Sequence, residues 1–193
     1  MNTKRIEHVE GLSLSINNQE IGVVSHYSGG KNIFVFSPEY TALPSNKRNT
    51  FTMSQLIDER YLHQPLISGQ RLPPVLSNLL PEGVLRDWMS QSLKVHVDNE
   101  FPLLAHMGKG LPGGIIATPI VAGQLPAWAL DHREQVEAVQ IDVEHQQNRF
   151  SLAGVQMKFS SVRNQDGRFN IGSDANHDSW IIKTPSTVHK FYS

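Results

Sequence analysis

The first third of the chain alternates apolar and polar residues, which is the pattern of half-buried β-strands. Residues 12–16 alternate leucine or isoleucine with serine, Asn17-Asn18 marks a turn, and residues 20–25 return as a second strand. Gly29-Gly30 makes another turn, and residues 33–36 form a third strand. We therefore predict a small antiparallel sheet at this end of the chain, followed by a polar loop.

The middle third has helical periodicity instead. We predict helices over residues 75–80, 84–93 and 101–107, with Pro81-Glu82-Gly83 separating the first two. Gly113-Gly114 then leads into a strand. Apolar residues of the longest helix fall on one side at helical spacing: Val84, Leu85, Trp88, Met89 and Leu93. The helices should therefore form a cluster packed on the sheet.

The last third divides into a polar connection and a second set of strands. Residues 123–147 are rich in Gln, Glu and His, and a new unit begins near Asn148. An Asp-Gly turn in that unit indicates a hairpin. We predict an α+β protein with a first subdomain over 8–122, a linker over 123–147, and a second unit over 148–193 whose strands are 157–162, 169–171 and 180–183.

Composition excludes several classes of protein. The 193 residues are 39% hydrophobic and 18% charged, with a net charge of −1, which is typical of a folded globular chain. There is no cysteine, so disulfide scaffolds and thiolate zinc sites are excluded. The nine histidines are scattered without ligand spacing, and the longest apolar run is too short to span a membrane. We expect a cytoplasmic protein that has no metal site of its own.

One loop has the composition of a phosphate-binding site. Ser151 to Gln156 lies between strands and contains the small residues Ala153 and Gly154, which let backbone N–H groups approach a phosphate. Lys183 ends an apolar strand, where its positive charge could reach the same phosphates. A plain β-hairpin with a solvated lysine at its edge explains these residues as well. The residues alone leave both interpretations open.

Three segments, taken in order, resemble a known family. They are Leu72-Pro-Pro-Val-Leu-Ser-Asn-Leu-Leu-Pro-Glu-Gly83 extended by the following Leu85-Arg86, Leu104-Ala-His-Met-Gly108 followed by Pro112-Gly-Gly-Ile-Ile116, and Phe150-Ser-Leu-Ala-Gly-Val-Gln-Met-Lys158 with Trp180-Ile-Ile-Lys183. With them the chain resembles, from about Leu12 to Lys190, the HipA-like serine/threonine kinases of bacterial toxin–antitoxin modules. The first segment also has a structural explanation, as a helix–break–helix that packs a core. Its polar residues Asn78, Glu82 and Arg86 either serve that packing or hold the subdomain against a kinase lobe or a partner.

The resemblance implies a fold and a set of site residues. The fold would be a small antiparallel β-sheet subdomain with a helical cluster, followed by the first antiparallel strands of a kinase-like N-lobe. ATP would be bound by Ala153, Gly154, Val155, Gln156, Met157, Lys158 and Lys183. Ser151 falls where family members autophosphorylate, and a phosphate there would compete with the phosphates of ATP and switch the kinase off.

The chain departs from the family pattern at its end. In the family, the aspartate that acts as catalytic base and the aspartate that binds Mg²⁺ lie well beyond the position of Lys183, and the chain has no residues there. We expect no catalytic residue and no metal ligand in these 193 residues, and no kinase activity from them alone. A kinase shortened at Ser193 is the simplest explanation.

The resemblance also implies partners and leaves alternatives. A full-length relative would phosphorylate a protein, in known members an aminoacyl-tRNA synthetase, and would be restrained by a helix-turn-helix antitoxin of the HipB type. Contact with DNA would be indirect, through that antitoxin, and no membrane is involved. Alternatively, residues 12–121 would suffice for a stand-alone module that docks on a separately encoded kinase and inhibits it. The strands after Asn148 favour the kinase interpretation, and a remnant of a broken gene is the third possibility.

Overall fold

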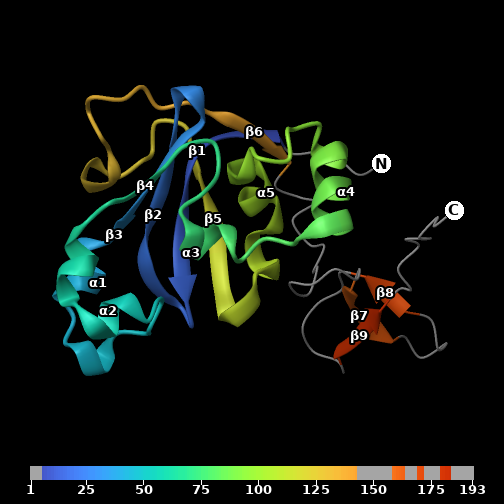
Figure 1. The fold of residues 1–193 in the computed structure, drawn as a ribbon, viewed down its shortest axis with the longest axis horizontal. Helices are drawn as coiled ribbons and strands as arrows, with labels where there is room; N and C mark the ends of the chain where they lie inside the picture. Colours follow the sequence, from blue (N-terminus) through green and yellow to red (C-terminus); the bar gives the residue numbers. More distant parts are fainter. Residues whose placement is uncertain (1–5, 143–157, 164–168, 172–178, 184–193) are drawn as a thin grey trace, which may run out of the picture.

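The described residues form two antiparallel β-sheets, and the helices lie in sequence between strands of the larger sheet (Figure 1). The computed structural model describes residues 6–142, 158–163, 169–171 and 179–183. One sheet has six strands, in the order β4-β3-β2-β1-β5 with β6 also paired to β1, and the other has the order β8-β7-β9. The predicted α+β class, with two sets of antiparallel strands, is confirmed.

The six-stranded sheet is built around its first strand. β1 pairs with β2 along one edge and with both β5 and β6 along the other. Asn17 and Asn18 join β1 to β2 with φ angles of 49° and 63°, the left-handed values that a tight hairpin turn requires. The strands are β1 Ile6–Ile16, β2 Gln19–Tyr27, β3 Lys31–Phe36, β4 Leu66–Ser68, β5 Ile115–Val121 and β6 Val139–Asp142.

The predicted helices are present, together with short elements that the sequence pattern did not indicate. The helices are α1 Pro38–Ala42, α2 Ser54–Ile57, α3 Pro74–Ser77, α4 Gly83–Leu93 and α5 Glu100–Met107. The unpredicted ones include α1, α2, β4, β6 and a 3₁₀ segment, η3, over Glu59–His63. Each spans only three to five residues, too few for a periodic signal, and such elements depend on tertiary contacts for their stability.

The main hydrophobic core lies between the sheet and the helices α3 to α5. Every residue of α5 except His106 is buried, and the helix packs against β5 and β6. Leu14 and Phe34 of the sheet meet Leu76 of α3 and Phe101 of α5 in the same buried cluster. Fully burying side chains of this size contributes roughly 1.5–3 kcal/mol each. The core therefore fixes where the polar groups at the helix ends can lie.

The longest helix buries a narrower face than its sequence pattern suggests. Leu85 and Met89 of α4 are buried in the core, as predicted. Val84 and Trp88, expected on the same side, are 50% and 46% exposed. These two residues lie at the margin of the buried stripe, because within the described part of the chain the main helix contact of α4 is with α5. A helix packed along one seam buries a narrower stripe than its apolar residues span.

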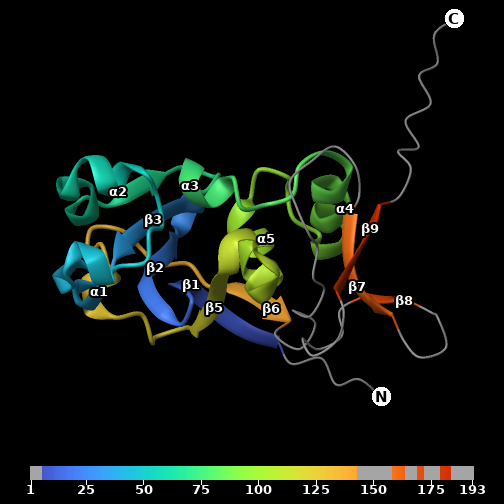
Figure 2. The same cartoon turned by 90° about the horizontal axis from the view of Figure 1, so that it is seen from below.

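A segment that we call the strap, residues 123–137, crosses the opposite face of the sheet (Figure 2). The Oη atom of Tyr27 donates to the carbonyl of Ala129 and accepts from the N–H of Asp131. The hydroxyl of Ser25 donates to the same carbonyl at 3.1 Å. This part of the predicted linker is therefore folded against the sheet and continues into β6. The linker's remaining residues, 143–147, lie outside the described part of the chain.

Candidate functional site

Two lysines of the predicted nucleotide site occupy paired positions in the second sheet. Its strands are β7 Lys158–Arg163, β8 Phe169–Ile171 and β9 Ser179–Lys183, close to the predicted bounds. Lys158 begins β7, Lys183 ends β9, and the antiparallel register makes them direct partners. The register therefore places two lysine positions side by side at one end of this sheet. A role for them in binding a nucleotide stays a prediction.

The predicted phosphate loop itself falls outside the described residues. Ala153, Gly154, Val155, Gln156 and Met157 belong to this group, as does the predicted phosphorylation site Ser151. Of the predicted ATP-binding residues, the structure thus gives backbone positions only for Lys158 and Lys183. The register of β7 and β9 brings these two together.

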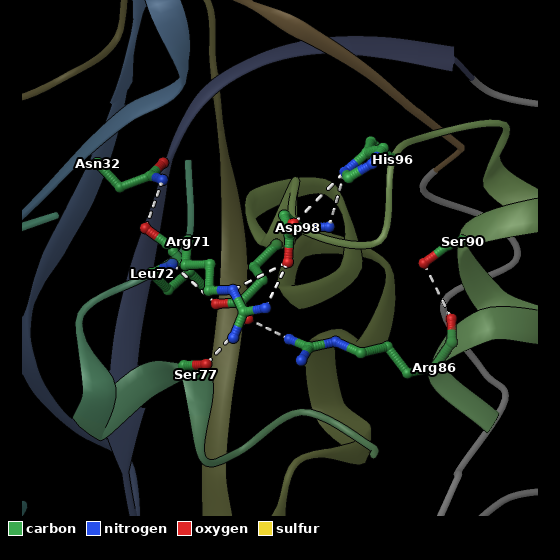
Figure 3. A network of polar contacts seen from close by, with 9 residues as sticks. Asn32, Arg71, Leu72, Ser77, Arg86, Ser90, His96 and Asp98 are labelled. Atoms are coloured by element: carbon green, nitrogen blue, oxygen red, sulfur yellow. Dashed lines mark hydrogen bonds and ion pairs between the residues drawn. The ribbon is translucent and has the colours of Figure 1, made fainter. Parts of the chain in front are cut away.

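The family-like Leu-Pro-Pro segment is organised by a buried carboxylate, Glu100. This residue begins α5 and its side chain is fully buried. Its carboxylate accepts a hydrogen bond from the backbone N–H of Leu72 at 2.8 Å and from the hydroxyl of Ser77 at 2.9 Å. The guanidinium of Arg86 completes the set with an ion pair (Figure 3). One carboxylate therefore ties the start of the segment, α3 and α4 to α5.

The ion pair assigns a structural role to Arg86, one of the three polar residues whose role the sequence left open. The side chain of Arg86 is only 15% exposed and is directed at Glu100, so it serves the packing of the subdomain. Asn78 and Glu82 are exposed at the ends of α3 and α4. The side chain of Glu82 makes no capping hydrogen bond to α4. A role for Asn78 and Glu82 in contact with another domain or partner stays a prediction.

A second buried polar side chain, Asn32, joins the sheet to the residues just before the same segment. The side-chain amide of Asn32 on β3 donates to the carbonyls of Gly30, Gly69 and Arg71 at 3.1–3.2 Å. Its Oδ1 lies 2.7 Å from Nδ1 of His26, so this nitrogen carries the proton. The His26 ring stacks on Phe101 of α5, with the ring centroids 4.6 Å apart. Buried polar side chains thus connect β2 and β3 to the Leu-Pro-Pro segment.

Glu100 was not among the residues predicted from the sequence, although its position next to an apolar run indicates that it is buried. Glu100 is the one charged residue next to the apolar run Phe101 to Ala105. A carboxylate at the start of so apolar a helix must be buried with it, and a buried charge requires partners. The partners could not be inferred, because Leu72, Ser77 and Arg86 lie 14 to 28 residues away.

The described side chains also limit the kinds of site that this part of the chain contains. They form no group of three or more His, Asp or Glu residues able to hold a metal ion. Within the same part of the chain, no helix is both long enough and apolar enough to cross a bilayer. The polar clusters around Glu100 and Asn32 bond to protein partners and are structural in character, although the Nε atom of Arg86 is buried without a hydrogen-bond partner among the described residues.

Comparison with known proteins gives the family. The sequence model described as the HipA N-terminal domain matches residues 12–118, more than half of the chain. The protein named "Putative kinase Y4dM" of Sinorhizobium fredii (strain NBRC 101917 / NGR234) is 33% identical over 185 residues, which cover 91% of this chain. The chain spans 41% of the length of that relative. With its six-stranded subdomain covering the matched residues, this chain belongs to the HipA N-terminal domain family.

Proposed function

We propose that the chain is the N-terminal part of a HipA-like serine/threonine protein kinase, with the second sheet forming the first edge of its ATP site. The observation that carries the proposal is the pairing of Lys158 with Lys183 in the backbone register, which brings two lysine positions to one end of a three-stranded sheet. Alignment with a kinase relative over most of this chain supports it. The remaining ligands proposed for ATP are Ala153 to Met157, and the ligands for Mg²⁺ and the catalytic base would come from a part of the kinase that these residues do not include.

The finer parts of this proposal follow from the family. The kinase would phosphorylate a protein, such as an aminoacyl-tRNA synthetase, in the cytoplasm, and would be controlled by a HipB-type antitoxin. Phosphorylation of Ser151 would place a dianion where the phosphates of ATP bind and would inactivate the enzyme.

Titration calorimetry with ATP tests the site in this chain. We expect weak binding, since the chain supplies only part of a nucleotide site, and at least a tenfold loss of affinity in Lys183→Ala and in Lys158→Ala. Lys94→Ala is the matched control, because Lys94 is an exposed lysine in the other part of the chain. Binding tighter than about millimolar that survives Lys183→Ala would refute the proposed role of that lysine.

A docking module for a separately encoded kinase is the second candidate. It is favoured by the buried core described above: among the described side chains, residues from Val9 to Ile141 pack into one cluster, so that this unit buries a core of its own. Adding the purified chain to an active HipA-like kinase that lacks this subdomain distinguishes the docking module from the kinase fragment. Stoichiometric inhibition would support the module, and restored or unchanged activity would support the kinase-fragment proposal.

A further inference from the structure

The strand β4 forms an open edge of the six-stranded sheet. It is the outermost strand, and it pairs only with β3, through the partners Asn32↔Ser68, Ile33↔Ile67 and Phe34↔Leu66. In an antiparallel pair, the N–H and C=O groups of alternate residues point away from the partner strand. Among the described residues, none bonds to the outward backbone groups of β4. The edge can therefore accept another strand.

This edge has only slight protection against the addition of a further strand. Native sheets protect an exposed edge by a very short edge strand, charged residues, proline, a bulge or a covering element. β4 is short, at three residues, and follows Pro65, but it consists of the uncharged residues Leu66, Ile67 and Ser68. It pairs with β3 without a shift in register, and Ile67 is 55% exposed. An uncharged edge with an exposed isoleucine is suited to a partner.

A hollow lies beside β4 on the face of the sheet that the strap crosses. This outer hollow has a volume of about 500 Å³. Ile33, Val35 and Ile67 form its apolar floor. Trp128 and Leu130 of the strap are among the residues on one side, and the end of η3 lies on the other. Its size and apolar floor are those of a pocket that accepts a large side chain.

A second hollow lies beside the same strand on the opposite face. This inner hollow, of about 420 Å³, is lined by Leu66 together with Tyr61 and Val75, which pack against the main core. Leu66 pairs with the core residue Phe34, whereas Ile67 pairs with Ile33 of the outer hollow. Neighbouring residues of a strand point to opposite faces, so the two hollows flank the edge of β4. Pro65 and Ile67 line both of them.

The charges around the two hollows indicate what would bind there. The inner hollow has no charged residue in its lining. In the outer hollow the charged side chains are Asp131 and Arg133, which bond to each other at 3.0 Å. An incoming strand would thus meet no charge in need of a partner, and a strand with charged side chains at these positions would lose their hydration without compensation. The complementary ligand is uncharged and apolar.

We propose that β4 is a docking edge for an extended, uncharged peptide segment of a partner protein. The segment adds a strand to the sheet, and two consecutive apolar side chains enter the outer and the inner hollow. Backbone hydrogen bonds supply affinity in this mode of recognition, and the pockets for alternate side chains supply specificity. The larger side chain occupies the outer hollow, where it meets Trp128. The proposal does not depend on the ATP site.

Selection from a phage-displayed library of random octapeptides on the immobilised 193-residue chain tests the docking edge. Peptides that are enriched on the natural sequence are synthesised with a fluorophore, and their affinities for the natural sequence and for Ile67→Lys are measured by anisotropy. We expect two consecutive apolar residues without a central proline, and at least tenfold weaker binding to Ile67→Lys. Trp128→Ala and Val75→Ala should each weaken binding. Trp128→Ala should remove contacts of the peptide residue in the outer hollow, and Val75→Ala those of the neighbouring residue in the inner hollow. The exposed position of Ile67 leaves folding intact, which thermal unfolding checks.

Backbone methylation of the peptide gives an independent readout. N-methyl groups on the alternate amides that face β4 should abolish binding, and the same groups on the other amides should leave it unchanged. The proposal is overturned if no peptide is enriched, if the enriched peptides bind Ile67→Lys equally well, or if both methylated forms bind. A concentration-dependent dimer that Ile67→Lys abolishes would also overturn it, because the occupant would then be a second copy of this chain.

Discussion

The guanidinium of Arg86 donates to the fully buried carboxylate of Glu100, and this pair joins α4 to the first turn of α5. The same carboxylate receives the N–H of Leu72 and the hydroxyl of Ser77, so its hydrogen-bonding capacity is used within the subdomain. A buried charge is tolerated only with such partners. The Leu-Pro-Pro segment, which drew attention as a family signature, thus carries residues that hold the fold together.

Removing Arg86 from this ion pair should lower the free energy of unfolding strongly. Arg86→Ala leaves the carboxylate of Glu100 buried without its counter-charge, and losses of about 3–5 kcal/mol in the free energy of unfolding are typical of that situation. Urea denaturation measures the loss. Arg71→Ala is the matched control, because Arg71 pairs with Asp98 with its side chain 61% exposed, where about 0–1 kcal/mol is expected. Equal losses in the two variants would contradict a buried structural pair.

A glycine of β2 should tolerate no side chain. A Cβ atom on Gly22 would lie 2.2 Å from the backbone carbonyl oxygen of Val35 and 2.8 Å from the ring of Phe34. The backbone cannot yield as a flexible side chain does, so Gly22→Ala should destabilise the fold by about 1–3 kcal/mol or more. Gly69→Ala is the control, since its Cβ would meet nothing within 4 Å. Thermal unfolding measures the melting temperatures of the two variants. A Gly22→Ala variant as stable as the natural chain would contradict the close approach of β2 and β3.

One residue holds a conformation that glycine would adopt more easily. Lys94 follows α4 with φ 57° and ψ 39°, and the N–H of Val95 bonds to the carbonyl of Ser90 across the helix end. Glycine adopts such left-handed angles without steric cost. Lys94→Gly should therefore raise the free energy of unfolding by roughly 0.5–1 kcal/mol. Lys94→Ala keeps the strain and should give no gain, so a similar gain from both variants would point to the loss of the charge instead.

The strap should contribute a pH-dependent term to stability. Hydrogen bonds from the side chain of Arg133 lower the pKa of Asp131 from 3.8 to about 2. Because the folded-state pKa is the lower one, this contribution is present above about pH 4 and is lost as the pH falls towards 2. The melting temperatures of the natural chain and Arg133→Ala should differ at pH 6 and converge near pH 2. High salt should reduce the difference in melting temperature at pH 6. A difference that does not change with pH would show that the Asp131–Arg133 pair is not its cause.

Long, strongly patterned segments were predictable from the sequence. The alternation of residues 12–16 and the Asn17-Asn18 turn gave the hairpin of β1 and β2, since a strand with one buried face shows its period directly. Helices α4 and α5 and strand β8 follow their predicted bounds within one residue. Of the candidate ATP site, the strand positions of Lys158 and Lys183 were predictable, because Lys158 lies at the start of the predicted strand 157–162 and Lys183 ends the apolar run Trp180 to Ile182.

The other features depend on contacts between residues that are distant in sequence. The role of Glu100, the exposure of Trp88 and the edge position of β4 follow from which surfaces meet, and composition within a short window does not encode that. The pairing of Lys158 with Lys183 likewise requires the register of β7 and β9. The sequence alone therefore determined the class and most of the elements through local periodicity, and the family through the similarity of its segments to known members. Tertiary structure decided which polar groups were buried together and which edge stayed open, because burial is a property of the assembled surfaces.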